Sequence, residues 1–295
     1  MTSSTASPIR FGLPKGRMQD QLFKLLADAG MHIRTTARGY RPILEIPGLA
    51  ASPDTKILKP QNIIEMLAAG SRDLGFAGGD WVAELNASVV ELFDTGLDPV
   101  RVVAAAPTDL LVSGFLPRNR RLVIASEYDR LTRAWIAAEK LDAAFVRSFG
   151  ATEVFPPEDA DCIVDVAATG ATLEANNLRV FAELTRSSTR LYANPRALED
   201  PAKRRFADDI VTLLKSVLEA RKRVMIEVNV SADRLEAVCK ALPCMREPTI
   251  SQLHAQGGYA VKAAVPRATL AKLLLDIKAA GGTDIAVSSL SQIVP

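Results

Sequence analysis

The sequence has few of the residues that build disulfide scaffolds, metal sites or covalent nucleophile sites. Its three cysteines form no Cys-x-x-Cys pair, which excludes a disulfide framework and favours free thiols. Its two histidines, His32 and His254, lie far apart and have no metal-ligating neighbours, so no protein-held metal site is expected. No Gly-x-Ser-x-Gly motif or Cys/His arrangement indicates a hydrolase.

Net charge, aromatic residues and long apolar runs are also scarce. Lys and Arg (36) nearly balance Asp and Glu (34), and aromatic residues make up 5% of the chain. Neither a basic surface nor stacking platforms for nucleic acid are therefore expected. No run of about 18 apolar residues could span a bilayer, and the N-terminus lacks the apolar core of a signal peptide. These absences predict a cytoplasmic protein without nucleic-acid or membrane partners.

What is present is an alternation of short apolar strands with amphipathic helices. This rhythm predicts an α/β fold with parallel sheets wrapped by helices. The strands are expected over 9–14, 55–59, 73–80, 101–107, 121–126 and 144–149, and the helices over 18–30, 60–70, 81–85 and 128–141.

The sequence pattern changes after Asn194-Pro195. Residues 200–224 predict a long charged helix, and the chain beyond about residue 223 has a strand-helix-strand-strand-helix-strand order. This βαββαβ order is typical of a ferredoxin-like domain. The second and third of these strands, within 247–253 and 258–265, are expected to join across Gly257-Gly258.

The stretch "DCIVDVAATGATLEANNL", residues 161–178, carries the clearest chemical signal. A buried strand ends near Asp165 and runs into a loop of small and hydroxylated residues, then a short helix. Backbone N–H groups in such a loop converge on a phosphate, helped by the hydroxyl groups of Thr169 and Thr172. The Asp165 carboxylate accepts hydrogen bonds from sugar hydroxyls, so the pattern indicates a phosphorylated ribose. The alternative is an ordinary strand-loop-helix corner with a threonine cap.

Lys15 and Arg17 are a second candidate pair. They flank Gly16 between a strand and a helix, and open α/β sheets bind ligands at this end of their strands. Arg grips phosphate oxygens bidentately, which suits a site for charged substrates. The alternative is a pair of solvated surface cations.

Several blocks of the chain resemble the ATP phosphoribosyltransferase family. The pattern DxIVDVxxTGxTLxxN resembles that family's loop for phosphoribosyl pyrophosphate (PRPP). Further blocks resemble the family in the same order along the chain, at residues 12–30, 68–84, 124–132, 149–156, 248–253 and 257–266. Together they cover nearly the whole chain.

The resemblance implies roles for individual residues. Asp165 would hold the ribose hydroxyls, and Glu153 is a second candidate for ribose or substrate contact, its alternative being a solvated loop carboxylate. Lys15 and Arg17 would be catalytic, stabilising the negative charge of the departing pyrophosphate. The residues implied to cradle the PRPP 5′-phosphate are Ala167, Thr169, Gly170, Ala171, Thr172 and Leu173.

The family pattern also puts Gly78 and Asp80 beside ATP. Asp80 follows Gly78-Gly79 near the start of a helix, so a helix N-cap is the other interpretation. Mg²⁺ would be the cofactor, held by substrate oxygens and water and not by a dedicated protein site.

The implied fold is a two-lobed catalytic core resembling a periplasmic-binding-protein fold, followed by a ferredoxin-like, ACT-like regulatory domain. Lobe I would comprise residues 1–100 and 190–221, lobe II residues 101–189, and the regulatory domain residues 222–295. The implied reaction joins the phosphoribosyl group of PRPP to N1 of ATP and releases pyrophosphate, the first step of histidine biosynthesis.

Histidine would inhibit the enzyme by feedback within homo-oligomers, from dimer to hexamer. The candidate histidine contacts are Asn229, Met245, Glu247 and Thr249. Asn229 stands where an acidic residue is expected, and Glu247 where a small polar residue is usual. Either the carboxylate has swapped sides of the pocket or histidine binds weakly.

Two other functions are compatible with such a chain. One is a non-catalytic, two-lobed protein that binds a small molecule, and the other is an inactive regulatory paralogue. The lack of a recognisable signal peptide argues against an exported receptor. The presence of Lys15, Arg17, Asp165 and the Thr169–Thr172 loop argues against an inactive paralogue.

Overall fold

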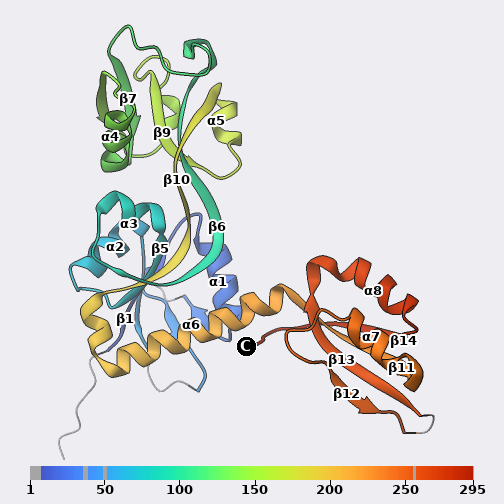
Figure 1. The fold of residues 1–295 in the computed structure, drawn as a ribbon. Coiled ribbons are helices and arrows are strands. Elements are labelled where there is room, and N and C mark those ends of the chain that lie inside the picture. The colour runs from blue at the N-terminus through green and yellow to red at the C-terminus, as the bar shows by residue number, and fades with distance from the viewer. Residues whose placement is uncertain (1–7, 36–38, 49–51, 255–256, 295) are drawn as a thin grey trace, which may run out of the picture. The chain divides into compact units, whose positions relative to one another are not determined.

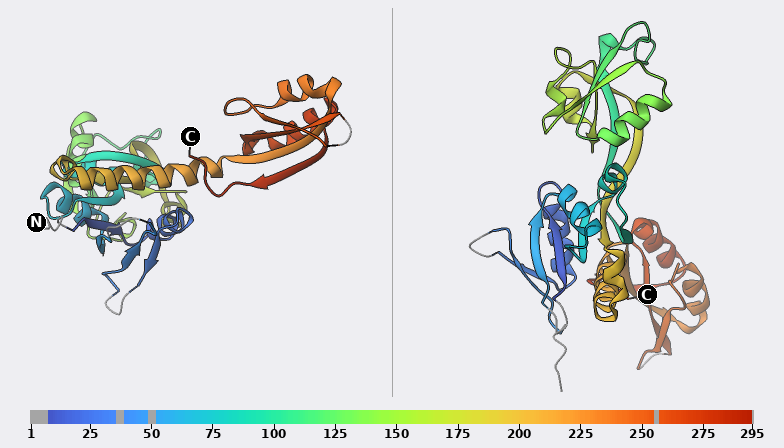
Figure 2. Two further views of the ribbon diagram at one scale, coloured as in Figure 1. Left: turned by 90° about the horizontal axis from the view of Figure 1, so that it is seen from below. Right: turned by 90° about the vertical axis from the view of Figure 1, so that its left-hand side faces the viewer.

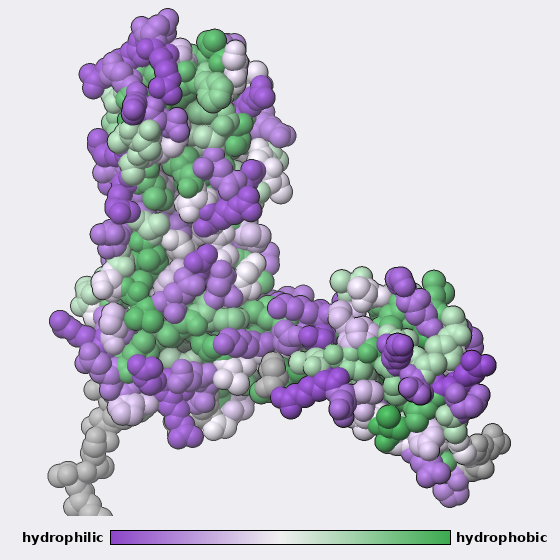
Figure 3. All heavy atoms as spheres, in the orientation of Figure 1, coloured by the Kyte–Doolittle hydropathy of each residue, from purple (hydrophilic) through white to green (hydrophobic). Residues whose placement is uncertain are grey.

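The computed structural model describes residues 8–35, 39–48, 52–254 and 257–294. The chain divides into two compact units, residues 1–208 and residues 209–295 (Figure 1). On the face shown in Figure 3, each unit carries hydrophilic residues over its surface, and hydrophobic residues are interspersed among them. In the described part of the chain, no helix combines the length and apolarity needed to cross a membrane.

The first unit is built on one mixed, eight-stranded sheet. Its strands are β1 (Arg10–Pro14), β4 (Asp54–Leu58), β5 (Leu74–Gly78), β6 (Val90–Pro107), β7 (Leu122–Ser126), β8 (Ala143–Arg147), β9 (Cys162–Ala167) and β10 (Leu178–Ala193). Their order is β4-β1-β5-β10-β6-β9-β7-β8. β1, β4 and β5 run parallel, as do β7, β8 and β9, so each end of the sheet is a parallel α/β group.

β6 and β10 lie between the two parallel groups and join them (Figure 1). They are antiparallel to each other, and each is antiparallel to its other neighbour. The expected parallel arrangement therefore holds within the two end groups but not for β6 and β10. The expected start of this strand at residue 101 is wrong, since β6 begins at Val90. The polar first half of β6 becomes a strand because it pairs with the second half of β10.

The helices of the first unit form where the sequence predicts them. α1 (Gln19–Asp28) buries Leu22, Leu25 and Leu26, and Gly30 follows it with a φ of 80°. α2 begins at Pro60, which suits the first helical position because its missing N–H needs no partner there. The remaining helices are α2 (Pro60–Ala68), α3 (Gly79–Leu85), α4 (Asp129–Ala138), α5 (Ala171–Ala175) and α6 (Pro201–Arg221), the last of which contains the division between the units.

The strand β6 supplies two cores at once. Val102, Ala104 and Ala106 pack in one hydrophobic cluster, and Val103 and Ala105 pack in another. Successive side chains of a strand point to opposite faces, so this continuous apolar run is what a strand covered on both faces requires. A short antiparallel pair, β2 (His32–Arg34) and β3 (Ile43–Glu45), forms a separate sheet.

The second unit has the predicted βαββαβ order. It comprises β11 (Arg223–Ser231), α7 (Leu235–Ala241), β12 (Thr249–Gln252), β13 (Gly258–Pro266), α8 (Leu270–Ala279) and β14 (Thr283–Ser289). The sheet is antiparallel, in the order β12-β13-β11-β14. Burial alternates along β11, where Val224, Ile226 and Val228 share a core with residues of α7 and α8. Figure 2 shows these two helices on one side of the sheet. The predicted α/β core and ferredoxin-like domain are thus confirmed.

The domain limits inside the first unit stay a prediction. The expected lobe limits at 100/101 and 189/190 fall within β6 and β10, which run through both groups of strands. The division between the units falls within α6, at 208/209, and the expected limit was 221/222.

A buried ion pair ties the first turn of α6 to β1. The Asp73 carboxylate accepts hydrogen bonds from Arg10 and from Lys203, and its exposed fraction is 3%. Burial alone would raise the pKa of Asp73, but the hydrogen bonds from Arg10 and Lys203 outweigh it and lower that pKa. The ionised form is therefore the one that stabilises the fold.

Asp73→Asn is expected to lower the free energy of unfolding by roughly 3 kcal/mol at pH 7, because it leaves two cations without their buried partner. A lowered pKa means that this stabilisation is present above the unfolded value of about 4 and is lost as the pH falls further. Urea unfolding at pH 7 and below pH 4 measures both effects. The control is Asp129→Asn, whose partner Arg133 is exposed, and which should cost under about 0.5 kcal/mol. Equal losses for both variants would contradict the assignment.

Candidate functional site

The predicted PRPP loop lies at the open corner between β9 and α5. Thr169, Ala171 and Thr172 are exposed, whereas Ala167 and Leu173 are buried and anchor the loop. Gly170 begins the helix with a φ of 90°, a conformation that glycine adopts most readily. No core side chain fills the corner: residues 165–173 and Glu153 line a hollow of about 180 Å³. The structure therefore brings together all eight residues of the predicted PRPP set.

Asp165 lies at the rim of this hollow. Its Oδ1 accepts a hydrogen bond from the Val166 backbone N–H at 2.7 Å. Burial raises the pKa of Asp165 to about 6, and the nearby charges of Glu153 and Glu127 add to this, although the bonds from Val166 and Thr152 oppose it. A carboxylate with so high a pKa in a pocket is typical of a functional site.

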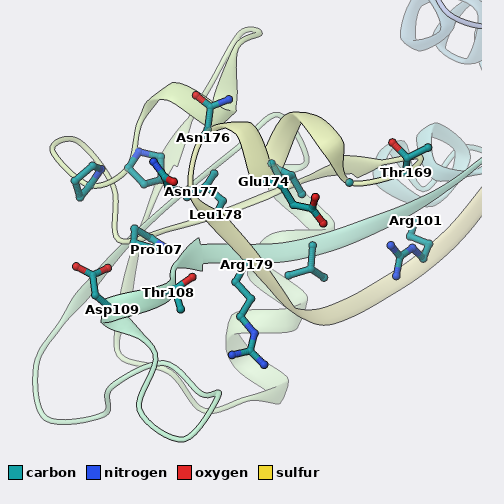
Figure 4. Close-up of a pocket in the computed structure, with 15 residues that line it drawn as sticks. Arg101, Pro107, Thr108, Asp109, Thr169, Glu174, Asn176, Asn177, Leu178 and Arg179 are labelled. Atoms are coloured by element: carbon teal, nitrogen blue, oxygen red, sulfur yellow. The ribbon is translucent and has the colours of Figure 1, made fainter.

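A larger cavity of about 840 Å³ adjoins the loop and shares Thr169, Gly170 and Leu173 with it. Arg101 and Arg179 also line it, as Figure 4 shows. Arg101 lies opposite Ala167 in the pairing of β6 with β9 and is 3.7 Å from Glu183. The sequence reasoning missed both arginines. The signal for Arg101 was a lone cation at the start of an apolar run.

Lys15 and Arg17 lie in the other α/β group. Gly16 between them has a φ of 81°, and Arg17 donates to the backbone carbonyl of Asp98 at 2.9 Å. The Lys15 ammonium lies 5.7 Å from the centre of the Tyr40 ring. Neither cation lines the hollow at the PRPP loop, so the structure does not bring the two predicted sets into one pocket.

Lys15 instead lines a pocket of about 330 Å³ that is rich in positive charge. The nearby Arg72 charge, together with burial and Arg41, lowers the pKa of Lys56. A pocket with this much positive charge suits a polyphosphate. Sequence reasoning missed it because its cations come from separate segments: Lys15, Arg41, Lys56 and Lys59.

Gly78 and Asp80 lie where β5 meets α3. The N-cap of α3 is Gly78 and Asp80 lies in the first turn, so the N-cap interpretation of Asp80 is wrong. Asp80 is buried, and its carboxylate accepts hydrogen bonds from Tyr128 Oη at 2.6 Å and Ser187 Oγ at 2.5 Å. A Cβ at Gly78 would lie 2.1 Å from Asp80 Oδ1, so glycine is required there.

A second carboxylate of α3 supports the neighbouring helix. Glu84 accepts hydrogen bonds from the backbone N–H groups of Arg130 and Leu131, each at 3.0 Å. These groups belong to the first turn of α4, whose own N-cap residue, Tyr128, makes no side-chain cap. Trp81 and Tyr128 stack with ring centres 4.6 Å apart. α3 therefore holds the start of α4 through charge, hydrogen bonds and aromatic packing.

The four predicted histidine contacts all lie in the second unit but on different strands. Asn229 is on β11 and pairs with Ala260, whereas Thr249 is on β12 and pairs with Lys262. Met245 and Glu247 are exposed and precede β12. Since β13 lies between β12 and β11, the set is spread over the sheet.

Within the residues that the structure describes, no three His, Cys, Asp or Glu side chains lie together as a metal site.

The first unit has two α/β groups joined by β6 and β10 and an open corner with a carboxylate at its rim, and the second unit is a separate ferredoxin-like domain. These features define a class: two-lobed α/β proteins with an appended βαββαβ domain. Comparison with known proteins identifies the member of this class. The family model of ATP phosphoribosyltransferase (HisG) matches residues 59–216, and the model of the HisG C-terminal domain matches residues 220–292. The chain belongs to the ATP phosphoribosyltransferase family.

Individual relatives agree with this assignment. The chain is 35% identical to the ATP phosphoribosyltransferase of Pelotomaculum thermopropionicum, over 97% of this chain and 99% of that protein. It is 33% identical to that of Chlorobium luteolum over the full length of both. Among solved structures, a chain of the ATP phosphoribosyl transferase (HisG:HisZ) complex from Thermotoga maritima matches with a TM-score of 0.59 at 22% identity, covering 70% of this chain and 98% of that one, which supports the fold. The protein is thus an enzyme of the first step of histidine biosynthesis, of the long form with a regulatory C-terminal domain.

If Asp165 accepts hydrogen bonds from the ribose hydroxyls, as the sequence predicts, the KM for PRPP should rise as the pH falls through about 6, because the protonated carboxyl group accepts them less well. Glu153→Gln removes a charge that raises the pKa of Asp165, so the midpoint of the pH dependence of this KM should move to lower pH. Steady-state kinetics between pH 5 and pH 8 measure both midpoints. Glu158→Gln, an exposed carboxylate outside the hollow, should leave the profile unchanged. A flat profile for the unaltered enzyme would contradict this role of Asp165.

Proposed function

We propose that the loop of residues 165–173 holds the phosphoribosyl donor. Its backbone N–H groups and the Thr169 and Thr172 hydroxyls bind the 5′-phosphate, and Asp165 accepts hydrogen bonds from the ribose hydroxyls, with Glu153 beside it. The single observation that carries this proposal is that the corner is open and forms one hollow with a carboxylate at its rim. Arg101, which lines the adjoining cavity, provides a cation for the same donor or for ATP.

The basic pocket, in the group that contains β1, β4 and β5, supplies positive charge, whereas the hollow at residues 165–173 supplies carboxylates. Lys15, Lys56 and Lys59 line the basic pocket and are suited to polyphosphate oxygens. In the reaction, N1 of the adenine attacks C1 of the ribose while the C1–O bond to pyrophosphate breaks. Pyrophosphate leaves with the bonding electrons, and an oxocarbenium-like transition state is expected by analogy with glycosyl transfer. Lys15 and Arg17 stabilise the charge that builds on the leaving group.

No covalent nucleophile is needed for this step. The enzyme gains most by holding two polyanions with C1 and N1 in contact, and by neutralising the departing charge. Asp80 and Gly78 remain candidates for the ATP side, and Asp80 would act there through the buried hydrogen bonds it makes to Tyr128 and Ser187.

Mg²⁺ enters this scheme with the substrate. Its ligands would be oxygen atoms of the pyrophosphate and of water. The Asp165 and Glu153 carboxylates, which line the hollow, would accept hydrogen bonds from such waters. When bound, the ion adds to the neutralisation of the leaving pyrophosphate.

The second unit is proposed to bind histidine and to inhibit the enzyme by feedback. Such feedback requires histidine to bind one conformational or oligomeric state more tightly than another. We propose that these states are homo-oligomers between dimer and hexamer, as the family resemblance implies. Asn229, Met245, Glu247 and Thr249 are the proposed contacts.

The direct test of the reaction is incubation with ATP, PRPP and Mg²⁺ while the ultraviolet absorbance of N1-ribosylated adenine is followed. Product formation supports transfer. A folded protein that binds these compounds without forming product would instead be a two-lobed binding protein or an inactive paralogue.

Lys15→Ala and Arg17→Ala are each expected to lower kcat by roughly 10²- to 10³-fold, because each removes a fixed charge that stabilises the leaving group. The KM for PRPP should change less than kcat. Steady-state kinetics measure both quantities. Lys24→Ala, which removes an exposed cation on the same α1 segment, is the matched control and should retain normal activity. A near-normal kcat in both variants would make Lys15 and Arg17 ordinary surface cations.

A further inference from the structure

Asp98, on β6, holds the candidate catalytic residue Arg17. Arg17 Nη1 donates a hydrogen bond to the backbone carbonyl of Asp98 at 2.9 Å. Arg17 is exposed and Asp98 is buried, so a buried backbone group holds a side chain that a substrate can reach. A guanidinium group has five N–H donors, and this bond uses one of them. Arg17 can therefore be held in place and still present donors to phosphate oxygens.

The backbone at Asp98 forms a bulge in β6. Ser187 of β10 pairs with Val100, and Thr189 pairs with Leu97, so three steps along β6 face two steps along β10. Asp98 falls between these two pairs and has a φ of 48°, a conformation that is uncommon for residues other than glycine and most accessible to Asn and Asp. A bulge leaves one residue outside the ladder, which frees its carbonyl to accept a hydrogen bond from a side chain.

The Asp98 carboxylate fixes this bulge to the neighbouring strand. Its Oδ2 accepts a hydrogen bond from Thr189 Oγ1 at 3.1 Å. The Thr189 carbonyl in turn accepts from Thr95 Oγ1 at 2.6 Å, and all three residues are buried. Thr189 also pairs with Gly78 of β5. The carboxylate therefore connects the carbonyl that holds Arg17 to the middle of the sheet.

The same contact brings Arg17 toward the candidate donor loop. Arg101 follows Asp98 by three residues on β6 and pairs with Ala167, which lies in the loop of residues 165–173. A strand rises by roughly 3.3 Å per residue, so the Cα atoms of Asp98 and Arg101 are at most roughly 10 Å apart. β6 thus spans the distance between the Arg17 side chain and the donor loop, although these belong to different groups of parallel strands.

We propose that Asp98 is a positioning residue for the transfer reaction. Its carbonyl directs the Arg17 guanidinium toward the pyrophosphate that leaves PRPP, and its carboxylate fixes that carbonyl through Thr189. Without the carboxylate the bulge loses its side-chain anchor, and the guanidinium is no longer held in one orientation. Positioning matters because a displacement of about 1 Å can lower a rate by about 100-fold. This inference rests on the proposed catalytic role of Arg17 and names the residue through which the fold directs it.

The test is a double-mutant cycle on the full-length enzyme, with kcat and the KM for PRPP measured in the absorbance assay. Asp98→Ala removes the carboxylate and should lower kcat by roughly 10-fold or more, with a smaller change in KM. Asp98→Asn keeps an acceptor oxygen and a residue type that adopts a positive φ, so it should recover most of kcat. In an Arg17→Ala background, Asp98→Ala should lower kcat by less than about twofold further, because no guanidinium is left to position.

Two further variants separate positioning from a loss of stability. Thr189→Val removes the donor to the Asp98 carboxylate without changing Asp98 itself, so it should reproduce the loss of kcat even where Asp98→Ala is too unstable to purify. Asp94→Ala is the matched control, since Asp94 lies in the same segment of β6 and bonds to Ser188 of β10. It should keep kcat within about twofold of the unaltered enzyme.

Equal losses from Asp98→Ala in the presence and absence of the Arg17 side chain would overturn the proposal, because the effect would not act through Arg17. Normal kcat in both Asp98→Ala and Thr189→Val would overturn it as well. A normal kcat in the single variant Arg17→Ala would instead refute the catalytic role of Arg17, and the inference with it.

Discussion

The antiparallel pairing of β6 with β10 is the constraint on which the first unit depends. It runs from Leu178 opposite Pro107 to Ala193 opposite Val90, with several register shifts along the way. β5 bonds to β10 and β9 bonds to β6, so both groups of parallel strands are attached through this one ladder. The basic pocket and the loop of residues 165–173 belong to different groups, and the pairing of β6 with β10 holds both groups in one unit.

The two groups of parallel strands carry charged side chains of opposite sign. Cations gather around Lys15 and Lys56, and carboxylates gather around Asp165 and Glu153. The whole chain has a formal net charge of only +2, so any anion that it binds must be held by local groups and not by the overall field. Burial raises the pKa of Asp165, and the nearby charge of Arg72, together with burial and Arg41, lowers the pKa of Lys56.

Much of the fold could be predicted from local pattern, because each strand and helix shows its own periodicity. The βαββαβ domain and the open corner after β9 are examples. What could not be predicted depends on pairings between distant segments. Residues 90–100 read as polar and irregular, yet they form a strand because β10 lies beside them. Asp80 resembles a helix cap until Ser187 and Tyr128 are brought against it, 107 and 48 residues away.

The contact of Glu84 with the start of α4 has a consequence for how the first unit can be divided. The first turn of α4 takes its cap from α3, and the Tyr128 hydroxyl takes its acceptor from the same helix. An excised fragment that begins after α3 would present bare amide groups at the α4 terminus and an unshielded aromatic face. The start of α4 therefore depends on α3, and separating the group that contains β7, β8 and β9 from α3 is expected to destabilise that group.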